Sequence, residues 1–401
     1  MSDLPIDDRL PFPAVRPSEH PVSDGAAPVT RPLRRSAGTI VLAILGFLVI
    51  SVLLVIVADY LVRALGPVAL AASLVLASVP LVIVLLGIRS IDRWEPEPRS
   101  ALLFAFLWGA AASVFIALLF SGITQYYEAA AGISRSAGTE FVASVLQAPV
   151  VEEFAKGLGI LLIFWAVRRT FDGPVDGVVY GATIAIGFAF TENLQYFGLA
   201  IIEDRGFGTD VVQTFLLRAI LSPFAHVMFT ACTGLALGLA ARRASAFGAV
   251  GYFVAGLIPA VLLHAFWNGA AYWATDWYRY YFLVQVPMFL LAIAGVARLR
   301  RHEQRLTRER LAEYASAGWF TPNEVNLLST AAGRRHAVAW AARHGARRQY
   351  SRFVRTATRL AFTRQRLITG RGAIGAPLDE VRLLAELAGD RRALAALPPL
   401  A

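Results

Sequence analysis

Residues Phe141 to Val167 read FVASVLQAPVVEEFAKGLGILLIFWAV, an apolar run with three charged side chains inside it. These side chains are the adjacent Glu152 and Glu153, together with Lys156. A charged side chain in hydrocarbon costs at least about 2.5 kcal/mol, and a partner or a function must recover that cost. The run therefore predicts a membrane helix with a functional site inside it.

The composition of the whole chain indicates a membrane protein with several spans. Hydrophobic residues make up 57% of the 401 positions and charged residues only 16%, whereas soluble domains are about 25% charged. We predict an all-α, polytopic membrane helix bundle of about eight transmembrane helices, since about 17–25 apolar residues cross a bilayer. The runs are Thr39–Leu65, Val68–Ile88, Ala101–Ile123, Phe141–Val167, Val175–Ala200, Val211–Ala241, Phe247–Trp273 and Tyr280–Val296.

The chain is expected to have three regions. Residues 1–38 are rich in proline and poor in apolar side chains, which is typical of a disordered tail. Residues 39–298 hold the spans. Residues 299–401 form a basic, helical C-terminal module, in which Thr321 to Glu324 read as an N-terminal capping box with proline at the first helical position.

Arginines near the span ends predict the orientation, because basic residues favour the cytoplasmic side. The loops alternate between the two sides of the membrane. On one side the span ends carry two or three arginines, such as Arg168 and Arg169, whereas each loop on the other side carries one, such as Arg135. We therefore expect both termini in the cytoplasm. The net charge of +10 fits anionic lipid headgroups facing the C-terminal region, and it does not indicate nucleic acid.

Helix length places the polar residues of four runs at one depth. Glu152, Glu192, His226 and His264 each lie about 16 residues from the cytoplasmic end of their run. At about 1.5 Å per residue, this places each of them about 24 Å from that end. Glu153 is turned about 100° from Glu152, so the two glutamates are expected to do different work. The later runs contribute Glu192 with Asn193, His226, and His264 with Asn268.

These motifs resemble the PrsW-type intramembrane proteases, which are similar to the wider group of CAAX-processing and bacteriocin-processing membrane peptidases. The segment EEFAK at 152–156 is similar to the family's E-E-x-x-K motif, and FAFTEN at 188–193 is similar to its F-x-x-x-E-N motif. His226, and the pair His264 and Asn268, resemble its two histidine motifs. The stretch DRWEPEP at 92–98 resembles a charged, proline-rich stretch of the family.

The resemblance covers about residues 39–298 and implies a transmembrane peptidase domain. It implies an integral protein of a bacterial cell membrane that hydrolyses peptide bonds of membrane-embedded or membrane-associated proteins. The substrates would be membrane proteins or peptides, including single-pass regulators, so the reaction would serve regulated proteolysis.

The residues themselves are suited to such hydrolysis. If ionised, the three glutamates carry about −3 and Lys156 about +1, an imbalance that a divalent cation would offset in a low dielectric. Two histidines and a carboxylate are typical of a catalytic zinc site with an open position for water. We expect a divalent metal, zinc by preference, held by Glu192, His226 and His264.

The expected catalytic residues are Glu152, Glu153, Lys156 and Asn268. Glu152 or Glu153 would be the general base, its neighbour would contact Lys156 or a backbone donor, and Asn268 would donate to the oxyanion. The resemblance to the wider peptidase group implies a metal-free alternative, in which Glu152 activates water directly while His264 and Asn268 stabilise the oxyanion.

Other interpretations remain open. The charged residues could form an ion pair that joins two helices, and the histidines could bond to backbone or hydroxyl groups. A proton-coupled transporter or a membrane scaffold could use the same buried carboxylates, although we find no inverted repeat. Arg218 is expected to anchor its span at the interface, or else to bind a substrate carboxylate or carbonyl.

Overall fold

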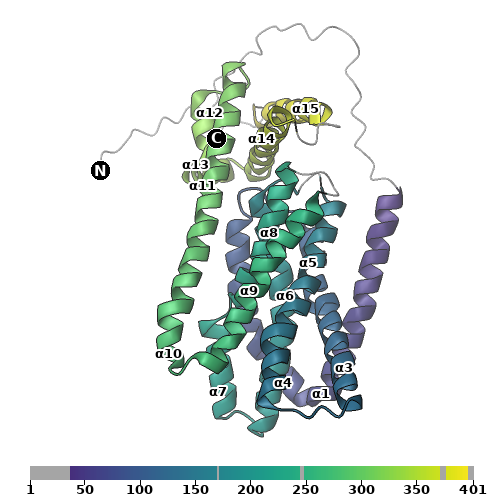
Figure 1. The fold of residues 1–401 in the computed structure, drawn as a ribbon. Coiled ribbons are helices and arrows are strands. Elements are labelled where there is room, and N and C mark those ends of the chain that lie inside the picture. Colours follow the sequence, from purple (N-terminus) through teal and green to yellow (C-terminus); the bar gives the residue numbers. More distant parts are fainter. Residues whose placement is uncertain (1–36, 169–170, 244–247, 371–375, 396–401) are drawn as a thin grey trace, which may run out of the picture. The chain divides into compact units, whose positions relative to one another are not determined.

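The structure, a computed structural model, describes residues 37–168, 171–243, 248–370 and 376–395, which are mostly helical with no strand among them (Figure 1). Two compact units divide the chain. One spans Arg35–Arg301 and the other contains His302–Ala401. The tail predicted for residues 1–38 lies outside the described residues, apart from Ala37 and Gly38, which begin helix α1.

The first unit is a bundle of long apolar helices, which confirms the predicted all-α polytopic fold. Its elements are α1 (Ala37–Ile91), α2 (Arg99–Leu107), η1 (Trp108–Ser113), α3 (Val114–Ala130), α4 (Ala137–Phe141), η2 (Val142–Gln147), α5 (Ala148–Ala166), α6 (Pro174–Glu203), α7 (Thr209–Phe215), η3 (Leu216–Leu221), α8 (Ala225–Arg243), α9 (Ala249–Trp273), α10 (Trp277–Tyr280), η4 (Tyr281–Gln285) and α11 (Val286–Ser316). The four η elements are π-helical.

Six helices of the described chain are long and apolar enough to cross a membrane. One of them covers two predicted spans, because α1 breaks at Gly66, whose φ of 74° is accessible to glycine without a Cβ clash. The predicted span from Phe141 to Val167 is helical through α4, η2 and α5. It is not among the six apolar helices, because it carries the charged residues Glu152, Glu153 and Lys156. The six are Ala43–Ile91, Arg99–Ala130, Pro174–Glu203, Thr209–Ala241, Ala249–Trp273 and Trp277–Ser316.

Helix α6 lies at the centre of this unit and is almost wholly buried. It packs against α1, α2, η1 and α8, as expected for a helix that is apolar on every side. Glycines allow the closest of these approaches. A Cβ atom on Gly177 would lie 1.9 Å from the backbone oxygen of Gly234, and one on Gly234 would lie 2.1 Å from that of Gly177.

The Gly234→Ala variant is expected to lose about 1–3 kcal/mol of unfolding free energy, because overpacking at a backbone contact forces α6 and α8 apart. The matched control is Gly251→Ala on α9, where an added Cβ meets nothing within 4 Å. Unfolding curves in detergent measure both variants. Equal stability of the two would show that the α6–α8 contact is not as tight as described.

The connector from Asp92 to Pro98 is fastened to α6. Tyr180 donates a hydrogen bond to Glu97 Oε2 (2.6 Å), and the backbone N–H of Glu97 donates to Asp92 Oδ1 (2.9 Å). Burial raises the pKa of Asp92 to about 6, and burial together with Asp176 raises the pKa of Glu97 well above its usual range. Trp94 and Glu97 are buried, so this stretch is a packed part of the bundle.

The second unit is a small helical domain with its own apolar core. It contains the end of α11 followed by α12 (Pro322–Ser329), α13 (Ala331–Arg343), α14 (Arg347–Ile368) and α15 (Ala376–Ala395). Leu311, Phe353 and Leu387 lie in this core. The predicted capping box is present, since Glu324 N donates to Thr321 Oγ1 (3.1 Å) and Thr321 N donates to Glu324 Oε2 (2.7 Å).

An arginine stripe runs along the exposed face of α14. Its members are Arg348, Arg352, Arg355 and Arg359. Residues three and four apart share one face of a helix, so these side chains point the same way. Arg352 is ion-paired with Asp390 of α15.

Candidate functional site

Lys156 of α5 lies at the centre of the polar residues inside the bundle. Its ammonium is fully buried and lies 2.9 Å from Glu153 Oε1, 3.2 Å from Glu152 Oε2 and 3.2 Å from His226 Nδ1. It also lies 3.8 Å from the centroid of the Phe188 ring. An ammonium so far from water needs these partners, because an isolated buried charge is very costly.

The two adjacent glutamates have different surroundings. Glu153 is fully buried: its Oε1 accepts from Lys156 and from His264 Nδ1 (3.1 Å), and its Oε2 accepts from Thr230 Oγ1 (2.7 Å). Glu152 has the Lys156 contact and keeps 13% of its side chain exposed. Glu153 is therefore a fully bonded support, while Glu152 is the carboxylate with access to open space.

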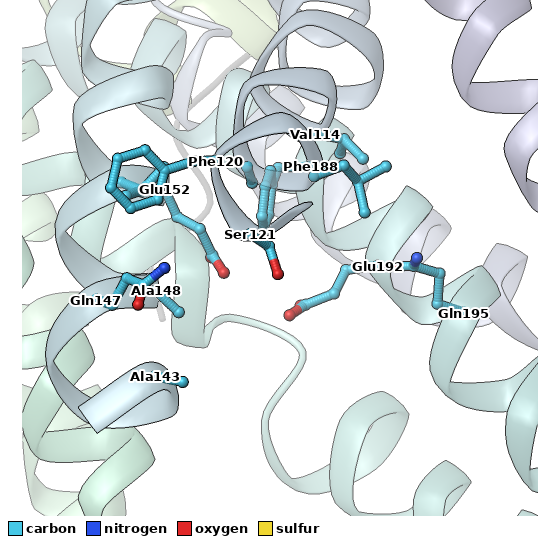
Figure 2. Close-up of a pocket in the computed structure, with 13 residues that line it drawn as sticks. Val114, Phe120, Ser121, Ala143, Gln147, Ala148, Glu152, Phe188, Glu192 and Gln195 are labelled. Atoms are coloured by element: carbon cyan, nitrogen blue, oxygen red, sulfur yellow. The ribbon is translucent and has the colours of Figure 1, made fainter. Parts of the chain in front are cut away.

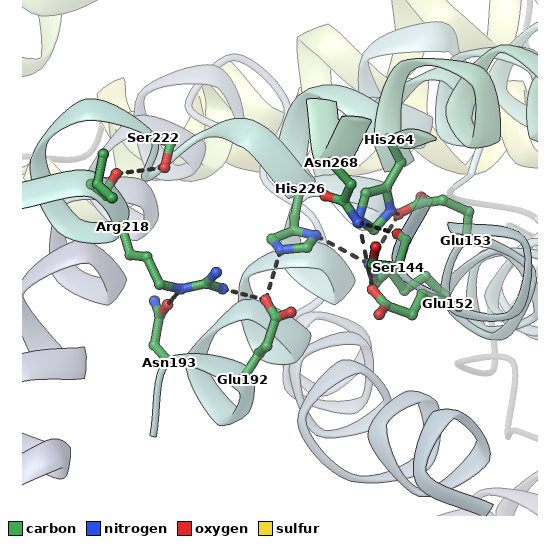
Figure 3. A network of polar contacts seen from close by, with 12 residues as sticks. Ser144, Glu152, Glu153, Glu192, Asn193, Arg218, Ser222, His226, His264 and Asn268 are labelled. Atoms are coloured by element: carbon green, nitrogen blue, oxygen red, sulfur yellow. Dashed lines mark hydrogen bonds and ion pairs between the residues drawn. The ribbon is translucent and has the colours of Figure 1, made fainter. Parts of the chain in front are cut away.

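Glu192 of α6 is held from two sides. It accepts a hydrogen bond from His226 Nε2 (2.8 Å) and is ion-paired with Arg218 of η3. Arg218 also donates from Nε to Asn193 Oδ1 (2.6 Å), as Figure 3 shows. Its guanidinium lies 3.8 Å from the centroid of the Tyr196 ring. The Arg218 side chain is 22% exposed and reaches Glu192, while the interfacial anchoring predicted for it stays a prediction. Asn193 positions this arginine.

The two histidines share one arrangement, in which a carboxylate accepts from one ring nitrogen. Glu153 accepts from His264 Nδ1 and Glu192 accepts from His226 Nε2, as Figure 3 shows. In a neutral ring, the other nitrogen then has a lone pair and can accept. For His264 this is Nε2, which lies 3.9 Å from Glu152 Oε2, and for His226 it is Nδ1, which accepts from the Lys156 ammonium (3.2 Å).

These residues fit a divalent metal ion. Glu152, His226 and His264 each offer a ligand atom, and the three atoms lie within 4.8 Å of one another. Two histidines and one carboxylate form a known catalytic zinc set, and metal-binding histidines commonly have a carboxylate on the second ring nitrogen. Glu192 was predicted as the third ligand. In the structure the carboxylate that lies with the two histidines is that of Glu152, while Glu192 contacts His226, so the ligand role of Glu192 stays a prediction.

A cavity of about 200 Å³ opens beside this cluster. It lies between α3, the η2–α5 segment and α6, and its wall includes both Glu152 and Glu192. Figure 2 shows the carboxylates of Glu152 and Glu192 directed into the same space, with the Ser121 hydroxyl between them. Glu153 is not part of the wall. The glutamate pair is thus divided between a cavity-facing and a buried member.

Asn268 of α9 bonds to the backbone of η2. The N–H of Ala148 donates to Ala143 O, five residues back, and the same pattern would pair Ser144 O with residue 149. Residue 149 is a proline and has no N–H. The amide Nδ2 of Asn268 donates to this Ser144 oxygen instead (2.9 Å). The Asn268 amide thus fixes η2 against α9, and the oxyanion role expected for it stays a prediction.

One residue of the network, Thr230, and one contact, between Arg218 and Glu192, were not predicted from the sequence. Thr230 lies four residues after His226 on α8 and donates to Glu153. This spacing placed it on the histidine's face of the helix, so it was a usable signal. The contact of Arg218 with Glu192 crosses between two helices, and spacing along one helix gives no signal for such a pair.

Comparison with known proteins gives a consistent result. The sequence model described as "PrsW family intramembrane metalloprotease" matches residues 97–292, which include every site residue named above. Proteins named "Protease PrsW" are 34% identical in Geobacillus kaustophilus, over 37% of this chain and 58% of that protein, and 35% identical in Clostridioides difficile, over 40% and 62%.

A third protein of the same name, from Bacillus subtilis, is 27% identical over 50% of this chain and 81% of its own length. The chain thus spans about three fifths of the first two relatives that it matches. No solved structure matches this chain significantly.

Proposed function

We propose, on the premise that this chain belongs to the PrsW family, that it is a membrane-integral endopeptidase acting on membrane-embedded or membrane-associated proteins. One observation carries the proposal. A carboxylate, Glu152, stands on a cavity wall beside two histidines whose second nitrogens are held by Glu153 and Glu192. Such an arrangement leaves lone pairs and a proton acceptor at the place where a peptide bond and water would meet.

A divalent ion, zinc in our proposal, would be held by Glu152, His226 and His264. When bound, it would make a water more acidic and polarise the scissile carbonyl. Glu192, the second carboxylate on the cavity wall, would then accept the proton of the attacking water, while Arg218 keeps Glu192 oriented. Glu153 is unsuited to this step, because both of its oxygens are already bonded.

A metal-free reaction is the alternative. Glu152 would take the proton from water directly, since its carboxylate faces the cavity, and His264 would contact the developing oxyanion. Lys156 supports either scheme, because its ammonium donates to both Glu152 and Glu153 and fixes the two carboxylates in place.

Metal analysis separates the two schemes. Purified protein is expected to hold about one divalent ion per chain, and His264→Ala to lower that occupancy at least about tenfold, because a ligand is lost. The control is His336→Ala on α13, an exposed histidine of the second unit. Mass spectrometry of bound metals gives the readout. Full activity in protein stripped of metal by a chelator would favour the metal-free reaction.

The location of the protein and its partners are also part of the proposal. We place the chain in a bacterial cell membrane with both termini in the cytoplasm, because arginines cluster on alternate span ends. The exposed arginine stripe of α14 supports contact of the C-terminal unit with anionic lipid headgroups. The substrates would be membrane proteins whose cleavage regulates another process.

Comparing membrane proteomes tests the proposed function. Cells with wild-type protein are expected to contain a cleaved membrane protein that accumulates uncleaved with Glu152→Gln or His264→Ala. The comparison reads out peptides on both sides of the cleavage position. If both variants process every membrane protein as the wild type does, the endopeptidase proposal is wrong, and a transporter or scaffold becomes the better interpretation.

A further inference from the structure

Trp108, the first residue of η1, is fastened to α5, the helix that carries both adjacent glutamates. Its indole Nε1 donates to the backbone oxygen of Ala155 (2.9 Å). The ring occupies the space that a side chain at position 159 would take, since a Cβ atom on Gly159 would lie 2.3 Å from Trp108 Cδ1. This contact therefore restrains α5 both along its axis and around it.

A second aromatic ring contacts α5 from another side. A Cβ atom on Gly157 would lie 2.8 Å from Cε2 of Phe253, a residue of α9. Gly157 and Gly159 are two residues apart, which is a turn of about 200° around the helix. Trp108 and Phe253 thus hold α5 from nearly opposite sides, and α5 cannot turn without displacing one of the two rings.

Each of these contacts lies on the face of one of the two glutamates. Glu152 is seven residues before Gly159, a turn of about 700° that returns to within about 20° of the same direction. Glu153 is four residues before Gly157, and residues four apart share a face. The η1 ring therefore contacts the face of the glutamate that lines the cavity, whereas the α9 ring contacts the face of the buried one.

The segment that carries Trp108 is itself fixed against α6, the central helix. A Cβ atom on the next residue, Gly109, would lie 1.9 Å from the backbone oxygen of Ile184. One residue further, Ala110 O accepts a hydrogen bond from Thr191 Oγ1 (2.8 Å). Through Trp108, η1 thus joins the helix of the two adjacent glutamates to the most deeply buried helix of the bundle.

We infer that Trp108 is a positioning residue for the reaction: held on α6 through η1, it fixes the rotation at which α5 turns Glu152, and not Glu153, toward the cavity and the two histidines. This inference rests on the proposed function. Trp108 is not part of the cavity wall, so it acts on the reacting groups through α5 alone.

Labelling of the two carboxylates tests this role without any substrate. Full-length protein in bilayers, with and without a chelator because a bound cation would shield Glu152, is treated with a carbodiimide and methylamine. The reagents convert accessible carboxyl groups to amides, and fragment mass spectrometry assigns the label. Wild-type protein is expected to be labelled at Glu152, which lines the cavity, in preference to Glu153, which is fully buried.

The Trp108→Leu variant, which lacks the ring and its N–H, is expected to lose this preference. It should also lower kcat about 10- to 100-fold with little change in KM, since a small misplacement of a reacting group costs up to about 10²-fold in rate. Trp108→Phe keeps a ring beside Gly159 and should recover most of the preference. The control is Trp165→Leu, an exposed tryptophan of α5, which should be labelled as the wild type is.

A folded Trp108→Leu protein, judged by its unfolding midpoint, that keeps the wild-type preference would overturn the inference, as would equal labelling of both glutamates in the wild type. If this variant does not fold, Gly159→Ala makes the same test, because its added Cβ displaces the ring from the α5 side. A preference that depends on Trp108 in a protein without any cleavage would support the positioning role and count against the proposed hydrolysis, so the two failures are distinguishable.

Discussion

The Glu152→Gln variant is expected to lose about 10²–10⁴-fold in kcat for cleavage of a membrane substrate, because the amide can no longer bind a cation as a carboxylate does or accept a proton from water. Both proposed schemes place this carboxylate at the reacting water. The fold should tolerate the change. Glu152 is partly exposed to the cavity, glutamine has the same shape, and Lys156 keeps its ion pair with Glu153.

The matched control is Glu140→Gln, an exposed glutamate on α4 of the same membrane segment. It is expected to keep wild-type kcat. Cleavage rates of purified variants in bilayers, measured beside their unfolding midpoints, separate a chemical effect from loss of structure. A folded Glu152→Gln protein with more than half of the wild-type kcat would rule out both schemes.

The Lys156→Met variant is expected to lose about 3–5 kcal/mol of unfolding free energy, the usual cost of breaking a buried ion pair by removing one partner. Lys156 and Glu153 are both fully buried, and removal of the ammonium leaves two carboxylates beside each other without a cation. Glu153→Gln should also destabilise the protein, because it leaves the Lys156 ammonium short of a charged partner and turns an amide N–H₂ toward one of the donors that the carboxylate bonded.

A double-mutant cycle checks this account of Lys156 and Glu153. Combining Lys156→Met with Glu153→Gln removes both charges, so the double variant should be more stable than the sum of the single losses predicts. Arg63→Met is the control, since Arg63 and Asp59 form an exposed ion pair worth about 1 kcal/mol or less. Additive losses in the cycle would show that Lys156 and Glu153 are not coupled.

The apolar runs predicted the fold well, because a span must be apolar over its full length and must bond its backbone internally. The breaks inside the runs were harder to predict. Gly66 divides α1, and Ser222 to Phe224 interrupt the run that holds His226. The π-helical segments were not expected either. In three of them, a side chain of another segment bonds to a backbone carbonyl: Thr191 to Ala110, Asn268 to Ser144 and Tyr281 to Leu221.

For the site, counting residues along each run indicated which polar groups share a depth, and the structure brings these groups into one network. The same counting could not show which of two adjacent glutamates faces open space. A turn of about 100° separates Glu152 from Glu153. Which one is buried depends on other helices: Thr230 of α8 and His264 of α9 bond to Glu153, whereas Glu152 faces the cavity. For the same reason the sequence could not show that Glu152 lies nearer to the two histidines than a ligand set with Glu192 implies, or that Glu192 contacts His226.

The central claim is that the site built around Glu152 hydrolyses a peptide bond with water. The direct test uses purified protein in lipid bilayers, surrounded by water enriched in oxygen-18. The substrate is the membrane protein that accumulates uncleaved with Glu152→Gln. Mass spectrometry of the products should find oxygen-18 in the new carboxyl terminus with wild-type protein, and intact substrate with Glu152→Gln. Intact substrate with both proteins, or labelled product at equal rates from both, would contradict the claim.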